Sequence, residues 1–118
     1  MAQYNHLPVF QTSYQLTLEI YQAARQFPRE FKYSLGQILK EMASGLMNTI
    51  VEANSAEEKA ESLERARLKL EQIRIHLRLA SDLKILGLNR FEIFSRLAEE
   101  ISKQLSGWLE WAVNNRRR

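Results

Sequence analysis

Apolar residues recur every three or four positions along most of this chain, which is the spacing of amphipathic helices. Residues 63–86 show this most clearly, because two apolar stripes lie on one predicted helix. The first stripe is a strict heptad and consists of Leu63, Ala66, Leu70, Ile73, Leu77 and Ala80. The second lies nearly opposite on the helical wheel and consists of Leu68, Ile75, Leu79 and Leu86. A helix of a small monomer has one core to face, so the second stripe predicts a subunit interface.

Three more helices follow from the same spacing. The first, over residues 8–26, has a stripe of Phe10, Tyr14, Leu18 and Tyr21, with further apolar residues away from it at Val9, Leu16, Ile20 and Phe27. The second spans residues 28–54, and its stripe is Leu35, Leu39, Met42, Leu46, Ile50 and Ala53. The last follows residue 89, and its stripe is Phe94, Leu97, Ile101, Leu105, Trp108 and Ala112. The spare face of the first helix is expected to join the subunit interface.

Local signals mark where these helices begin and end. Ser55 and Glu58 have the spacing of a capping box, so we expect the third helix to start there. Gly87 is expected to end it, and Asn89 with Glu92 to start the last helix. Because the connections are short, the pattern predicts an all-α fold, an antiparallel up-down-up-down four-helix bundle.

Two further expectations concern the bend between the first two helices and the glycines of the second helix. Phe27, Phe31 and Tyr33 surround Pro28 and are expected to pack as a corner, not to serve as a stacking platform for bases. Gly36 and Gly45 lie inside the second helix, where each costs about 1 kcal/mol relative to alanine. We therefore expect a neighbouring helix to approach closely at these glycines.

Length and composition agree with one small domain. The chain has 118 residues, of which 45% are hydrophobic, with 4 Gly, 2 Pro and no Cys. We expect a single domain over residues 1–118, with an N-terminal lead at 1–8 and a basic tail at 114–118. The absence of cysteine excludes disulfides and thiolate sites. There is neither a signal-peptide pattern nor an apolar run of about 20 residues, so a cytoplasmic protein without membrane contact is expected.

Catalytic and metal-binding motifs are missing from the sequence. The two histidines, His6 and His76, have no second histidine or carboxylate at the i+3 or i+4 spacing of a bundle metal site. No glycine-rich phosphate loop, nucleophile elbow or zinc-protease motif occurs. The sequence therefore predicts no enzyme activity, no cofactor and no metal site.

Basic residues border the second apolar stripe. Arg67, Arg74 and Arg78 fall within roughly 40° of each other on the helical wheel. A solvated face that complements the helix dipole would contain the same residues, but in an oligomer symmetry would repeat the row and concentrate its field. The net charge of +3 permits an anionic partner. The candidate residues for contact with nucleic-acid phosphates or a protein partner are Arg67, Arg74, Arg78, Lys84, Arg116, Arg117 and Arg118.

Four segments, in order along the chain, together resemble one protein family. They read FPREFKYSLG at 27–36, IVEAN at 50–54, LRLASDLK at 77–84 and LSGWL at 105–109. The set is similar to the four-helix-bundle family of proteins encoded in 23S ribosomal RNA intervening sequences and of accessory variability determinant (Avd) proteins of diversity-generating retroelements. The second and third segments are closer to the Avd branch.

The resemblance implies a barrel-like homopentamer that binds the reverse transcriptase of the retroelement and its template RNA. From the basic residues themselves we expect mostly electrostatic binding, of RNA and also of DNA, without sequence preference. Such a protein supports mutagenic reverse transcription and is not an enzyme. The resemblance gives no counterpart for Arg116, Arg117 and Arg118. Two other functions stay open. One is a structural protein of the intervening-sequence type without a reverse transcriptase partner. The other is a small all-α enzyme whose arginines line a water-excluded anion site.

Overall fold

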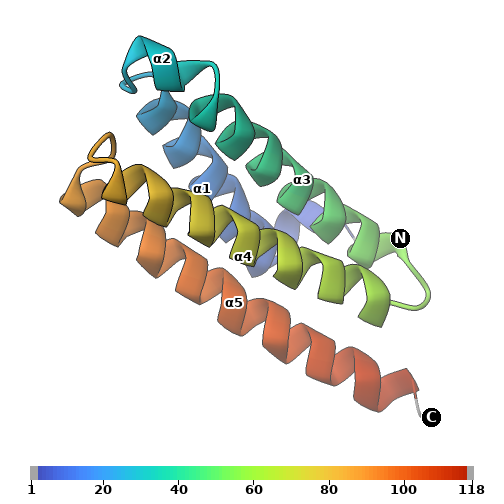
Figure 1. Ribbon diagram of the computed structural model, residues 1–118. Helices are drawn as coiled ribbons and strands as arrows, with labels where there is room; N and C mark the ends of the chain where they lie inside the picture. Colours follow the sequence, from blue (N-terminus) through green and yellow to red (C-terminus); the bar gives the residue numbers. More distant parts are fainter. Residues whose placement is uncertain (1–2, 117–118) are drawn as a thin grey trace.

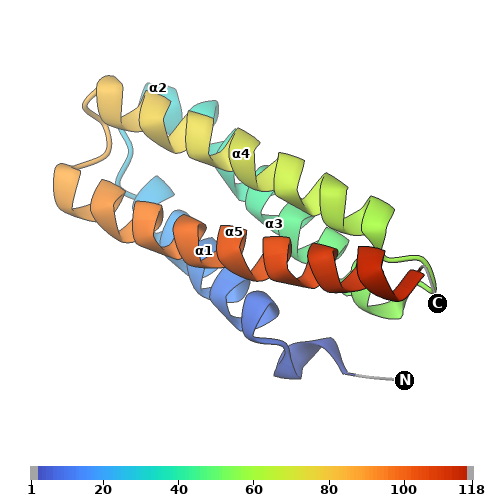
Figure 2. The ribbon, with the colours of Figure 1, turned by 90° about the horizontal axis from the view of Figure 1, so that it is seen from below.

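The computed structural model describes residues 3–116, and all regular structure in that range is helical. The elements are the 3-10 helix η1 (Tyr4–His6) and the α-helices α1 (Pro8–Ala24), α2 (Arg29–Lys32), α3 (Leu35–Ser55), α4 (Ala60–Asp82) and α5 (Leu88–Arg116). Helices α1 and α4 each pack against both α3 and α5, so the four long helices enclose one core (Figure 1). The bundle measures 52 × 21 × 20 Å. The connection from α1 to α3 and the α4–α5 turn lie at one end, and the α3–α4 loop lies at the other (Figure 2).

The core confirms the heptad stripe on α4 and most of the stripes on α3 and α5. All six residues of the first α4 stripe are buried, and so are Leu39, Leu46 and Ile50 on α3 and Phe94, Ile101 and Leu105 on α5. Met42, Leu97 and Trp108 are partly buried and pack against this core. Because these faces meet inside the bundle, the opposite face of α4 is turned to solvent.

The predicted stripe on α1 is wrong. Tyr14, Leu18 and Tyr21 are exposed, and the core face is instead made of the residues Val9, Leu16, Ile20, Ala23 and Phe27. The physical reason is that a buried tyrosine needs a partner for its hydroxyl group, whereas the aliphatic residues need none. Ser13 and Thr17 also lie on the buried face, and the Thr17 hydroxyl donates to the Ser13 carbonyl oxygen at 2.8 Å.

The second helix is broken near its start. The chain forms the short α2, leaves the helical conformation at Tyr33 and Ser34, and resumes at Leu35. A β-carbon added at Gly36 would lie 3.3 Å from the Phe31 carbonyl oxygen. The expected close approach of a neighbouring helix is therefore found at Gly36, where the Ala24 side chain of α1 would lie 3.5 Å from that β-carbon and the bend at Phe31 comes closer still. At Gly45 the nearest atoms, from Lys69, lie at ordinary contact distance.

The predicted capping box in the α3–α4 loop is also wrong. Ser55 is the last residue of α3, and its hydroxyl donates weakly to the carbonyl oxygens of Val51 and Glu52. Instead, the Lys59 ammonium donates to the carbonyl oxygens of Ala53, Asn54 and Ala56 at 2.8–3.0 Å. These are carbonyls that the end of α3 would otherwise leave without partners, and the cation also complements the negative end of the helix dipole.

The α4–α5 turn differs from the expectation in a way that moves Leu86. Helix α4 ends at Asp82, and Lys84 takes the left-handed conformation with φ of 64°. The Lys84 amide donates to the Ser81 carbonyl oxygen and the Ile85 amide to that of Ala80, which is the Schellman pattern that glycine usually provides. This turn carries Leu86 into the core, where it is 5% exposed.

The start of α5 is shifted as well. Gly87 precedes the first residue of α5, and its carbonyl oxygen accepts the Phe91 amide at 3.0 Å. Asn89 therefore lies inside the first turn of α5 and is not its cap. The expectation that Gly87 ends α4 is wrong, because Lys84 already reverses the chain.

Candidate partner-binding surfaces

The outer face of α4 carries a row of solvent-exposed apolar side chains. Leu68 is 60% exposed, Ile75 is 63% exposed, and Leu79 and Leu83 are exposed by nearly half. Three of the four residues predicted for a subunit interface are thus on the surface. The fourth, Leu86, is buried, and the exposed Leu83 takes its place in the row. Leu83 lies four positions after Leu79 and was missed because the helix was expected to continue to residue 86. We call Leu68, Ile75, Leu79 and Leu83 the α4 stripe.

The α4 arginine row, consisting of Arg67, Arg74 and Arg78, lies between the α4 stripe and α5. Each arginine has a carboxylate nearby. Arg67 lies 3.0 Å from Glu64, Arg74 lies 3.8 Å from Glu71 and 3.6 Å from Glu99, and Arg78 lies 3.9 Å from Asp82. Four carboxylates therefore face three guanidinium groups, so the row alone does not produce a positive surface.

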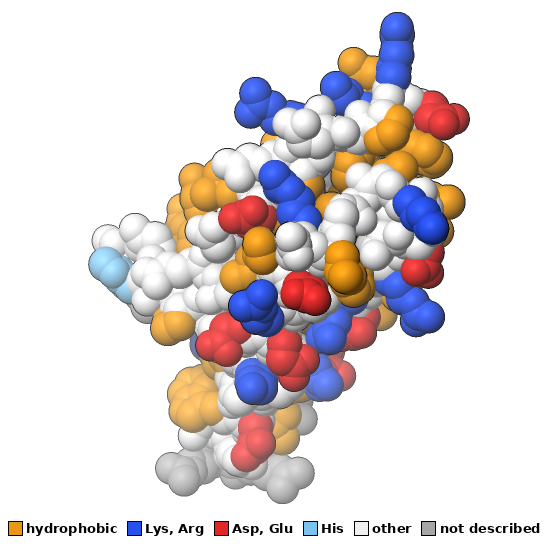
Figure 3. All heavy atoms as spheres, turned by 90° about the vertical axis from the view of Figure 1, so that its left-hand side faces the viewer, with side chains coloured by type: hydrophobic (Ala, Val, Ile, Leu, Met, Phe, Trp, Pro, Cys, Tyr) orange, Lys and Arg blue, Asp and Glu red, His pale blue; other side chains and the backbone are white. Residues whose placement is uncertain are grey.

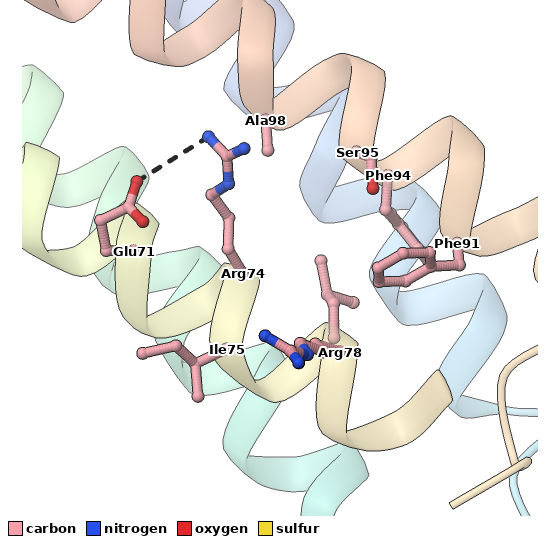
Figure 4. A pocket seen from close by; sticks show the side chains of 9 residues that line it. Glu71, Arg74, Ile75, Arg78, Phe91, Phe94, Ser95 and Ala98 are labelled. Carbon is pink, nitrogen blue, oxygen red and sulfur yellow. Dashed lines mark ion pairs between the residues drawn. The ribbon is translucent and has the colours of Figure 1, made fainter. Parts of the chain in front are cut away.

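Two adjoining depressions lie between α4 and α5, and we call them together the α4–α5 groove. One has a volume of about 310 Å³, and the other about 340 Å³. Small residues of α5 line both, Ser95 and Ala98 the first and Ser102 the second, while Ile75 and Leu68 of α4 form the matching walls. Figure 4 shows Arg74 extending from α4 toward α5, with its ion pair to Glu71 drawn. Because Arg78 is largely exposed, this groove is not the water-excluded arginine pocket expected of an enzyme.

A basic surface lies at the end of the bundle that holds both α2 and the α4–α5 turn (Figures 1 and 2). Residues 25–32 and 82–90 contain five cations and two carboxylates. Within the described residues, four of these cations form no ion pair. They are Arg25, Arg29, Lys32 and Lys84, and we call them the basic end. Figure 3 views the molecule from this end and shows cationic side chains spread over it.

Only Lys84 of the basic end was among the predicted contact residues. Arg25, Arg29 and Lys32 were missed because they are distant in sequence from Lys84, and the fold brings the two segments to one end. Tyr33, beside Lys32, is 77% exposed. The expectation that Tyr33 packs into the corner with Phe27 and Phe31 is wrong, because α2 ends there and turns this ring outward.

The opposite end of the bundle carries charges of both signs. Residues 52–64 contain five glutamates and one lysine, Lys59, and they include the α3–α4 loop. Arg65 follows directly and pairs with Glu52 and Glu61. Arg117, Arg118 and the side chain of Arg116 lie outside the described residues, so their role in partner binding stays a prediction.

A second apolar surface is found on α1. Tyr14, Leu18 and Tyr21 are exposed on one face, and Phe10 continues this face toward Tyr4. The Tyr4 and Phe10 rings meet edge to face with centroids 4.9 Å apart. The Lys40 ammonium of α3 lies 5.4 Å from the Tyr21 ring centroid. We call Phe10, Tyr14, Leu18 and Tyr21 the α1 aromatic face.

Histidine chemistry gains no support from the fold. Nδ1 of His76 lies 2.8 Å from the carbonyl oxygen of Gln72, one turn earlier on α4. No group of three or more possible metal ligands occurs among residues 3–116. Of the helices in this same range, none combines the length and the apolarity needed to cross a membrane.

Comparison with known proteins agrees with this architecture. No curated protein matches the chain. The family model described as bAvd-like matches residues 8–112, from the first residue of α1 to the last turns of α5. This confirms the resemblance to Avd-type four-helix-bundle proteins and indicates an accessory protein of that type. The chain belongs to the bAvd-like family.

Proposed function

We propose that this protein is the non-enzymatic accessory protein of a diversity-generating retroelement. It binds the element's reverse transcriptase and template RNA and supports mutagenic reverse transcription. The observation that carries the proposal is the bAvd-like match over residues 8–112. The basic end, whose four cations form no ion pair within residues 3–116, supplies a physical means of holding the RNA backbone.

RNA contacts the basic end more strongly than the α4 arginine row. At the basic end, phosphates displace only water and counterions, and counterion release favours binding. At the arginine row, phosphates compete with Glu64, Glu71, Glu99 and Asp82 for the same guanidinium groups. Tyr33 adds an exposed ring on which a base can stack. Because phosphate contacts carry no sequence information, DNA binds the same surface.

The chain assembles into a homopentameric, barrel-like ring of antiparallel bundles. The α4 stripe and the α1 aromatic face are both exposed in one chain, and apolar surfaces of this kind mark interaction sites. They lie on different helices, so a contact between them is head to tail and closes a ring when the rotation fits. Five copies of a weak site on one ring raise each other's effective concentration for the polymerase.

The test is co-purification with the reverse transcriptase encoded beside this gene, with and without nuclease treatment. The parent chain and Leu79→Glu are compared, with Leu88→Glu as the control because Leu88 is exposed outside the stripe. We expect the parent and the control to retain the polymerase. Leu79→Glu should lose the polymerase, because an unpaired charge buried in a subunit contact costs about 3 kcal/mol or more. A parent chain that fails to bind the polymerase under both conditions contradicts the proposed function.

A further inference from the structure

The α4–α5 groove has a regular spacing along its length. Its two depressions are walled by Leu68 and Ile75, seven residues apart on α4. On the α5 side, Ser102 and Ser95 are also seven residues apart. Seven residues of helix span about 10.5 Å. The groove therefore offers two sites for side chains that are one heptad apart on an added helix.

The α1 aromatic face has the matching period. Tyr14 and Tyr21 are seven residues apart, both are exposed by about half, and Leu18 lies between them. We propose that Tyr14 and Tyr21 of one copy of this chain insert into the two depressions of the α4–α5 groove of a second copy. This inference rests on the proposed ring and names its mating surfaces.

The groove suits tyrosine better than a purely apolar side chain. Glu71 lines both depressions, and Ser95 and Ser102 line one each, so a phenol hydroxyl entering either finds an acceptor. The contacts of Arg74 with Glu71 and Glu99 span 3.6–3.8 Å, which is longer than a good hydrogen bond. These groups therefore have donors and acceptors available for the phenols, while the rings bury apolar area against Leu68 and Ile75.

Charge does not oppose this pairing. Helix α1 has one carboxylate, Glu19, and Glu19 is directed toward Arg90 of α5. The charged residues that line the groove are Arg67, Arg74 and Arg78 together with Glu64 and Glu71. Each of these arginines has a carboxylate nearby, so the α1 aromatic face meets groove charges that are already paired.

The test uses two variants that each break one mating surface. The α1 variant is Tyr14→Glu with Tyr21→Glu, and the groove variant is Leu68→Glu with Ile75→Glu. All four side chains are exposed in the single chain, so both variants should keep the parent's helical circular dichroism. If glutamate lowers the helix content, serine at the same positions gives the same readout. Tyr33→Glu and Leu88→Glu are the matched controls.

Sedimentation velocity then separates the outcomes. We expect each double variant alone to be a 13.9 kDa monomer and the controls to assemble as the parent does. An equal mixture should form a dimer of twice that mass and nothing larger, because each variant retains the surface that the other lacks. An α1 variant that still forms rings overturns the inference, and so does a mixture that stays monomeric at every concentration. A monomeric parent chain would instead contradict the ring of the proposed function.

Discussion

The basic end and the α4 arginine row contain the same kinds of side chain in different surroundings. Arg67, Arg74 and Arg78 follow one face of a helix, and carboxylates from α4 and α5 lie beside each of them. Arg25, Arg29 and Lys32 come from a bend and are joined by Lys84 from a distant turn, with no ion pair in the described residues. A helical wheel therefore shows where cations gather, whereas neighbouring helices decide whether their charge is available to a ligand.

The largest effect is expected from reversing charge at the basic end. Arg25→Glu with Arg29→Glu should lower RNA affinity on the order of a hundredfold at low salt and flatten the salt dependence, because fewer counterions are released. The control is Arg96→Glu with Lys103→Glu, which changes the net charge equally on the exposed side of α5. Fluorescence anisotropy with a labelled single-stranded RNA over a salt series measures the affinity and its salt dependence for each variant. Equal losses in the two variants would mean that total charge, and not the basic end, sets the affinity.

A smaller effect should follow from removing the arginine row. Arg74→Ala with Arg78→Ala should weaken RNA binding only about twofold to threefold and for all sequences alike, because these cations are already partly neutralised. Circular dichroism establishes that the variant is folded. If this variant loses as much affinity as Arg25→Glu with Arg29→Glu, the distinction between the two surfaces is wrong.

Removing the carboxylates should convert the row into a binding surface. Glu71→Gln with Glu99→Gln frees Arg74, and we expect RNA affinity to rise about threefold with a salt slope steeper by about one. Glu92→Gln with Glu100→Gln removes the same charge elsewhere on α5, where neither glutamate forms an ion pair in the described residues. A gain no larger than in this control would show that the ion pairs do not mask Arg74.

The smallest effect concerns Lys84, which joins the basic end at a conformational cost. Its φ of 64° lies in the left-handed region, where a residue with a β-carbon is less stable than glycine by about 1 kcal/mol. Lys84→Gly should raise the melting temperature by about 4 °C while lowering RNA affinity slightly, because one cation is lost. Calorimetry measures the melting temperature, and the anisotropy assay measures the RNA affinity. A lower melting temperature would show that the lysine stabilises the turn by some other contact.

The sequence was sufficient to predict the elements that repeat regularly. The α4 heptad stripe predicts a buried face, and six residues from Leu63 to Ala80 are in the core. Wherever the chain leaves a helix, periodicity stops being informative. The helical period, continued past Asp82, predicts that Leu86 lies on the surface, because the period alone does not show that Lys84 ends the helix.

The choice between two faces of α1 and the composition of the basic end could not be obtained from periodicity. Both faces of α1 have apolar residues at helical spacing, so periodicity alone does not choose between them. The hydroxyl groups of Tyr14 and Tyr21 favour the aliphatic face for the core, and the packing of α1 against α3 and α5 buries that face. Similarly, Arg29 and Lys84 are 55 residues apart, so their common surface exists only in the folded chain. Glu99, which pairs with Arg74, lies on α5 and not on α4. This ion pair therefore also exists only in the folded chain.

Binding of RNA at the basic end is measured most directly by mapping photo-cross-links between this protein and bound single-stranded RNA with mass spectrometry. We expect cross-links in residues 25–33, with Tyr33 foremost, and in residues 82–90 at the same end of the bundle. Cross-links concentrated in residues 64–78, along the α4 arginine row, would contradict it.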